Sequence, residues 1–156
     1  MTSTADDATA PAPLRILVGV DGSPESLTAL RTAAVMARGM HGRLRVVTAW
    51  TDPVTVADGY VAPPVDFGET ATTAQREAIV TVLGEDGLRE VDTAVGYGGA
   101  AQVLIDESAN ADLLVLGSRG LGGFTGLLLG SVSRACAEHA HCDVLVARDT
   151  MRARLA

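Results

Sequence analysis

Glycine and serine residues in the second half of the chain have the spacing of a phosphate-binding loop. The apolar run Leu113-Leu-Val-Leu116 is followed directly by Gly117-Ser-Arg-Gly120, and Gly130-Ser131 comes ten residues later. This pattern predicts a buried strand, a glycine-rich loop and then the start of a helix. Glycine lacks a Cβ atom, so the backbone here can turn sharply and approach a ligand closely. The unpaired N–H groups and positive dipole end of a helix beginning at Gly130-Ser131 would favour an anion, and phosphate is the obvious candidate.

A second candidate loop lies near the start of the chain. Asp21 follows the apolar run Arg15–Val20 and precedes Gly22-Ser-Pro24. Ser23 is a good helix N-cap and Pro24 suits the first helical position. Because Ser23 already fits the cap, we expect the Asp21 carboxylate to contact a ligand rather than to cap the helix.

The elements that must position these loops alternate along the chain. Apolar runs predict strands at 15–20, 44–50, 90–95, 112–116 and 143–147, and helical periodicity predicts helices at 24–39, 71–83, 100–110 and 131–139. This alternation predicts an α/β fold, a doubly wound five-stranded parallel sheet with helices on both faces. With the strand order 3-2-1-4-5, the loops after strands one and four would face each other across a crevice at the carboxyl edge.

The ends and one internal segment lack such patterns. Residues 1–13 are expected to form a disordered tail, residues 14–148 a single domain, and residues 149–156 a frayed end. Residues 51–69 are expected to form a long loop that is functional or mobile rather than a packed connector. The N-terminus does not resemble a secretory signal and no apolar run is long enough for a membrane span, so a cytoplasmic protein is the default expectation.

The charged residues exclude several classes of function. The net charge is −7, which argues against nucleic-acid or anionic-membrane partners. All 12 basic residues are arginine. A Walker A loop, a protein kinase and Schiff-base chemistry each require a lysine, so all three are excluded.

Two other motifs are better explained by structure than by function. Gly96-Tyr-Gly-Gly-Ala-Ala101 has the spacing of a dinucleotide fingerprint, but it follows the third strand and the next strand does not end in an acid. Cys136, His139, His141 and Cys142 are too closely spaced for a typical structural zinc site. We therefore predict no metal site, and no catalytic residues are identified, because the nucleophile-elbow motif Gly-x-Ser-x-Gly is lacking.

The glycine motif and the first strand together resemble the nucleotide-binding branch of the universal stress protein family. Gly117, Gly120, Gly130 and Ser131 match its pattern of Gly, two residues, Gly, nine residues, Gly and then Ser or Thr. The resemblance runs from about Leu14 to Arg148 and includes Ile16-Leu-Val-Gly-Val-Asp21. It implies the strand order 3-2-1-4-5, the fold called adenine nucleotide alpha hydrolase-like, and a Rossmann-like mode of nucleotide binding.

The resemblance also implies a ligand and a set of contacts. ATP is the implied cofactor, and Mg²⁺ could accompany its triphosphate. Asp21 would accept a hydrogen bond from adenine, supported by the backbone at Gly19 and Val20, and Ala49 would flank the base. Ribose and phosphates would be held by Leu116, Gly117, Arg119 and Gly120. The phosphate tail would be bound by Gly130, Ser131, Val132 and Ser133.

The implied partners are an adenine nucleotide, an unidentified protein and a second copy bound through the last strand. Family members often carry Pro at the place of Ala100 and Cys-Pro-Val where this chain has Cys142-Asp-Val144. Asp143 puts a charge at the start of the strand expected to form the dimer edge. The expected role is a nucleotide-dependent stress-response regulator. The alternatives are a protein-interaction module that binds no nucleotide, and a slow ATPase.

Overall fold

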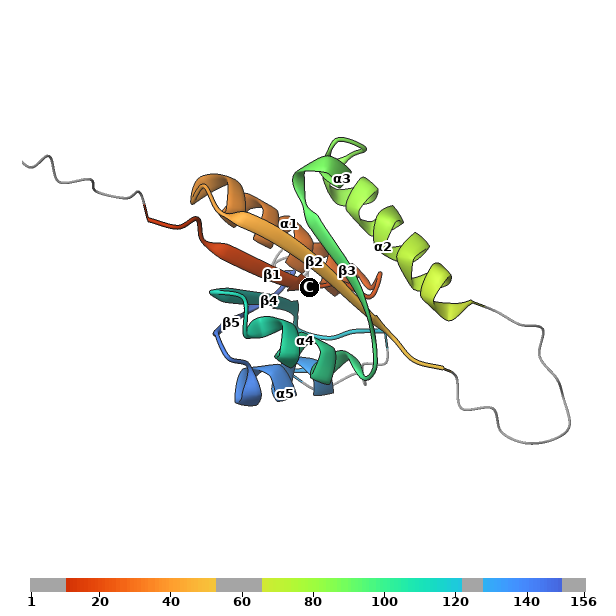
Figure 1. The fold of residues 1–156 in the computed structure, drawn as a ribbon. Helices are drawn as coiled ribbons and strands as arrows, with labels where there is room; N and C mark the ends of the chain where they lie inside the picture. Colours follow the sequence, from red (N-terminus) through yellow and green to blue (C-terminus); the bar gives the residue numbers. More distant parts are fainter. Residues whose placement is uncertain (1–10, 53–65, 122–127, 150–156) are drawn as a thin grey trace, which may run out of the picture.

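A five-stranded parallel sheet forms the centre of the molecule (Figure 1). The computed structural model describes residues 11–52, 66–121 and 128–149. Its strands are β1 (Arg15–Gly19), β2 (Arg43–Trp50), β3 (Asp92–Tyr97), β4 (Leu113–Gly117) and β5 (Asp143–Ala147). They pair in the order β3-β2-β1-β4-β5, and every pair is parallel. The predicted strand order is therefore confirmed.

Helices cover both faces of this sheet, as predicted (Figure 1). The helices are α1 (Pro24–Gly39), α2 (Phe67–Leu83), α3 (Gly87–Glu90), α4 (Ala100–Ser108) and α5 (Ser131–His139). On one face, α1 packs against β1 and β4 and α2 against β2 and β3. On the other, α4 packs against β2, and α5 packs against α4 and β5. None of the helices in the described ranges combines the length and apolarity needed to span a membrane.

The central strands are apolar throughout because both of their faces are buried. Ile16 and Val18 belong to the core under α1 and α2, whereas Leu17 between them belongs to the core under α4 and α5. Successive side chains of a strand point to opposite faces, so a strand between two helical layers needs apolar residues at every position.

The start of α1 agrees with the local sequence signals. The Ser23 hydroxyl accepts a hydrogen bond from the Ser26 N–H at 3.2 Å, and Pro24 is the first helical residue. Pro fits there because its missing N–H would have no intrahelical acceptor. Asp21 lies in the short connection between the end of β1 at Gly19 and the start of α1 at Pro24, so these two elements position its carboxylate.

The predicted loop at 51–69 is wrong at its end, because α2 begins at Phe67 rather than near residue 71. The side chain of Asp66 caps the helix, accepting from the Glu69 N–H at 2.9 Å. This cap stabilises a first turn that lacks the apolar periodicity of the rest of the helix. Residues 53–65 of the predicted loop lie outside the described residues, as do residues 1–10 and 150–156 of the predicted tails.

The third strand also differs from its predicted bounds, since β3 covers 92–97 rather than 90–95. Its register is set by β2, with Arg45 opposite Asp92 and Trp50 opposite Tyr97. The rings of Trp50 and Tyr97 meet edge to face, with centroids 4.9 Å apart. The short helix α3 occupies the residues just before the strand, and this four-residue element is too short to show a periodic pattern.

Candidate functional site

A cavity of about 440 Å³ opens at the carboxyl edge of the sheet. All twelve site residues predicted from the sequence line it. They are Gly19, Val20, Asp21, Ala49, Leu116, Gly117, Arg119, Gly120, Gly130, Ser131, Val132 and Ser133. The cavity lies within the 300–1,000 Å³ range typical of small-molecule sites.

The topology explains why the cavity forms here. Neighbouring strands β1 and β4 send the chain to opposite faces of the sheet, since β1 leads to α1 and β4 leads through the glycine-rich loop to α5. The two connections separate at the sheet edge and leave a crevice between them, which is the usual ligand position in doubly wound sheets.

The N-terminus of α5 forms one wall of the cavity. Gly130 is the N-cap, with extended backbone angles φ −70° and ψ 166°, and no side chain caps the helix. The Gly130 N–H donates to the Ser118 carbonyl at 2.7 Å. The following N–H groups, at Ser131, Val132 and Ser133, have no intrahelical acceptor because they are in the first turn. Together with the helix dipole, they form a wall suited to an anion.

Ser133 has a second role in this wall. Its buried hydroxyl donates to the Gly117 carbonyl at 2.7 Å. This bond links the first turn of α5 to the end of β4. The hydroxyl hydrogen is therefore already engaged, and Ser133 can offer a phosphate its N–H but not this proton.

Asp21 forms the opposite wall and links both loops. Its Oδ1 accepts from the Ser23 N–H at 2.9 Å and its Oδ2 from the Leu121 N–H at 3.0 Å. Partial burial raises the pKa of Asp21, but the hydrogen bonds from Ser23, Leu121 and Ser26 outweigh it and hold the pKa below its usual value. The side chain is thus a carboxylate at neutral pH. A carboxylate has about four lone-pair sites, so it can accept a further hydrogen bond from a ligand.

The three motif glycines differ in what surrounds them. A Cβ atom on Gly117 would lie 2.7 Å from backbone atoms of Glu25, so this glycine allows α1 to pack against β4. A Cβ on Gly120 would lie 2.6 Å from Asp21 Oδ2, so this one allows the carboxylate to reach the loop. A Cβ on Gly130 would meet nothing closer than 3.4 Å. Packing within the described chain therefore requires Gly117 but not Gly130.

Both charged side chains of the cavity lining are held toward α1. Asp21 lies on the α1 side, and the backbone of Arg119 lies beside the first turn of α5. The Arg119 guanidinium reaches across to α1, where its Nη2 lies 3.4 Å from Glu25 Oε1. An adenine amino group would suit the Asp21 carboxylate, and a phosphate would suit the first-turn N–H groups of α5.

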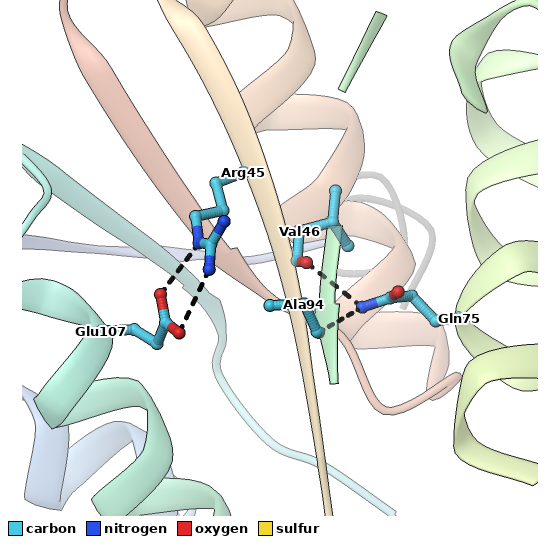
Figure 2. Close-up of polar contacts among 5 residues, drawn as sticks. All are labelled: Arg45, Val46, Gln75, Ala94 and Glu107. Carbon is cyan, nitrogen blue, oxygen red and sulfur yellow. Dashed lines mark hydrogen bonds and ion pairs between the residues drawn. The ribbon is translucent and has the colours of Figure 1, made fainter. Parts of the chain in front are cut away.

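The floor of the cavity is apolar and is fixed by a buried hydrogen-bond chain. Val20 accepts from the Thr48 hydroxyl at 2.8 Å, and Thr48 in turn accepts from Gln75 Nε2 at 3.2 Å. The same Gln75 amide, from α2, donates to the carbonyls of Val46 at 3.1 Å and Ala94 at 2.8 Å (Figure 2). These hydrogen bonds connect α2, through β2, to Val20, the cavity residue that follows β1.

Sequence reasoning missed five residues that line the cavity: Ser26, Val47, Ala100, Leu104 and Leu121. Ala100 and Leu104 lie on α4 and Val47 on β2, where their apolar character indicates core residues. No local signal separates an apolar core residue from an apolar ligand contact. Only the distance to the two loops reveals them.

The two rejected motifs have structural explanations. Gly96 allows close packing of α4 on β3, since a Cβ there would lie 2.6 Å from a methyl carbon of Val103. Gly98 has φ +136°, which favours glycine. Cys136 is fully buried. In the described ranges, no three side chains of His, Cys, Asp or Glu come together as a potential metal site.

The sheet order and the edge cavity define the class of protein, a doubly wound α/β protein, and the solved structures that it resembles have the fold called adenine nucleotide alpha hydrolase-like. Comparison with known proteins then gives the family, because the model of the universal stress protein family matches residues 14–148. The chain belongs to the universal stress protein family.

Curated relatives support this assignment. A universal stress protein of Mycobacterium tuberculosis is 36% identical over 151 residues, covering 94% of this chain and 50% of the relative. The chain thus spans about half the length of these mycobacterial relatives. A putative universal stress protein of Staphylococcus aureus is 31% identical over 139 residues, covering 85% of this chain and 82% of the relative.

Solved structures agree with the fold. The universal stress protein UspA from Lactobacillus plantarum superposes with a TM-score of 0.69 at 24% identity, covering 88% of this chain and 99% of the other. A universal stress protein in complex with cAMP gives 0.59 at 25% identity, covering 88% and 98%. A family member from Arabidopsis thaliana with AMP bound gives 0.52 at 18% identity, covering 87% and 92%. Some relatives of this fold therefore bind adenine nucleotides.

Proposed function

We propose that this chain binds ATP in the cavity between Asp21 and the N-terminus of α5, and acts as a nucleotide-dependent stress-response regulator. The observation that carries the proposal is the uncapped first turn of α5, which faces a cavity lined by every residue of the nucleotide motif. The adenine nucleotides bound to related proteins of the same fold add support.

In the proposed complex, the adenine lies on the apolar floor beside Ala49 and Leu116, with its amino group toward the Asp21 carboxylate. Ribose and the first phosphate contact the backbone of Gly117 and Gly120. The phosphate tail accepts hydrogen bonds from the first-turn N–H groups of α5, where the helix dipole also favours it. Hard phosphate oxygens would bring Mg²⁺ with the triphosphate.

We also propose a homodimer formed through β5. This strand lies at the edge of the sheet, and Val144, Leu145 and Val146 remain partly exposed. An edge strand offers unpaired backbone groups to another strand. The charge of Asp143, at the start of β5, would then lie at the border of the interface.

A Gly130→Asp substitution tests the nucleotide site, because it should change stability and binding in opposite directions. Gly130 has N-cap backbone angles and room for a side chain. An aspartate there would cap α5, raising the unfolding free energy by roughly a few tenths of a kcal/mol, and would repel phosphate. We expect ATP affinity, measured by isothermal titration calorimetry, to fall at least about thirtyfold.

The charge control is Gly39→Asp, in the last turn of α1, where nothing lies within 4 Å of the place that a Cβ would take. Gly39 does not line the cavity and lies at the end of α1 opposite to Glu25. This variant carries the same added charge and should keep ATP affinity within about threefold, since a distant, exposed charge is screened by solvent. A wild-type protein that shows no heat and no thermal stabilisation with millimolar ATP would support the interaction-module alternative. Phosphate release by purified protein would support the ATPase.

A further inference from the structure

The cationic side chain of the candidate site is already paired with an anion of the chain itself. Among the described residues that line the cavity, Arg119 is the only one with a cationic side chain. Its Nη2 lies 3.4 Å from Oε1 of Glu25, the second residue of α1. The two side chains are partly exposed, at 41% for Arg119 and 23% for Glu25. A phosphate tail bound at α5 could therefore pair with Arg119 only by replacing Glu25.

We propose that Glu25 competes with the phosphate groups of the nucleotide for Arg119, and so sets how strongly the site prefers a highly charged tail. This inference rests on the proposed function. Glu25 lowers affinity in proportion to the negative charge of the ligand, so its effect is large for ATP, smaller for AMP and absent for adenosine.

The geometry allows this exchange at small cost. At 3.4 Å the pair is longer than the 2.7–2.9 Å typical of a strong charge-assisted hydrogen bond. Arginine binds phosphate readily, because its planar fork matches two phosphate oxygens. Glu25 retains a favourable partner after the exchange, since it lies in the first turn of α1 near the positive end of that helix dipole.

Position supports the competition as well. The backbone of Arg119 lies next to the N-cap of α5, since a Cβ on Gly130 would be 3.4 Å from Arg119 Cα. Glu25 is held against the other side of the loop, with its backbone packed on Gly117. The Arg119 side chain therefore starts beside the first turn of α5 and ends at an anion on α1.

The test is a series of calorimetric titrations with ATP, AMP and adenosine, in buffer containing EDTA so that no metal ion neutralises the tail. Glu25→Gln should bind ATP about fivefold more tightly, AMP less than about twofold more tightly, and adenosine unchanged. In an Arg119→Gln background, the same substitution should change ATP affinity less than about twofold, because the guanidinium for which Glu25 and phosphate compete is absent.

Glu90→Gln is the matched control. It removes the same charge and breaks the Arg38–Glu90 pair, whose atoms lie 3.2 Å apart at the far end of α1. All three affinities should stay unchanged in this variant. The inference fails if Glu25→Gln leaves ATP affinity unaltered, shifts adenosine as much as ATP, or acts equally without Arg119. Wild-type protein that binds none of the ligands refutes the proposed function itself.

Discussion

Gly117→Ala should destabilise the fold in the absence of any ligand. The added Cβ would lie 2.7 Å from the backbone carbon and oxygen of Glu25. Ordinary contact begins at 3.4 Å, so the first turn of α1 and the end of β4 must move apart by about 0.7 Å. Both neighbours are backbone atoms of packed elements and cannot rotate away. Overpacking of this kind costs about 1–3 kcal/mol of unfolding free energy.

The measurement is thermal and urea unfolding of nucleotide-free protein, followed by circular dichroism. For a chain of this length, about 2 kcal/mol corresponds to a Tm lower by about 4–8 °C. The control is Gly39→Ala, in the last turn of α1, where an added Cβ meets nothing within 4 Å. That variant should be as stable as wild type or slightly more stable. If Gly117→Ala unfolds within about 0.5 kcal/mol of wild type, the packing argument is wrong.

Three further predictions concern residues that do not line the cavity. Gln75→Leu should lower the unfolding free energy by about 1–3 kcal/mol in urea titrations, because buried strand carbonyls lose their donor. Asp112→Asn should lower the unfolding free energy at neutral pH but not at low pH. Hydrogen bonds from Arg15 lower the pKa of Asp112 from its ordinary value of 3.8 to about 2 in the folded protein. The difference in unfolding free energy between wild type and variant should therefore disappear as the pH falls from about 4 to 2. Iodoacetamide at pH 8 should label Cys142 slowly, because this thiol is partly exposed although burial also raises its pKa. Mass spectrometry should find Cys136 unmodified, because burial shields it and raises its pKa to about 11.

The features predicted well from the sequence are those with strong local causes. The start of α1 follows from Ser23 and Pro24, and the buried strands follow from unbroken apolar runs. The beginning of α2 escapes prediction because its cap, Asp66, lies between Pro63-Pro64 and Gly68, which are residues typical of a loop. The bounds of β3 escape it because the register of this strand depends on pairing with β2, a contact between residues far apart in the chain.

The same distinction applies to the candidate site. Residue type and spacing are enough to indicate loop residues such as Asp21 and Gly130. They do not indicate Leu104, because its side chain reaches the cavity from a helix whose apolar face also packs in the core. The pairing of Arg119 with Glu25 joins residues 94 positions apart and depends on how α1 packs against β4. Tertiary contacts of this kind have no signature in the local sequence.

The three motif glycines belong to one sequence pattern but are needed for two different physical reasons, which are close packing and ligand binding. Gly117 is required by the packing of α1 on β4, and Gly120 by the approach of the Asp21 carboxylate, whether or not a ligand binds. Only Gly130 stands where the chain has room for a side chain and leaves a helix uncapped. The first two glycines are therefore explained by the architecture, and the third is explained by the proposed phosphate site. A variant that keeps Gly117 and Gly120 but caps α5 at position 130 should fold normally and lose the proposed phosphate binding. Measuring the unfolding free energy and the ATP affinity of that variant separately distinguishes a packing role from a binding role.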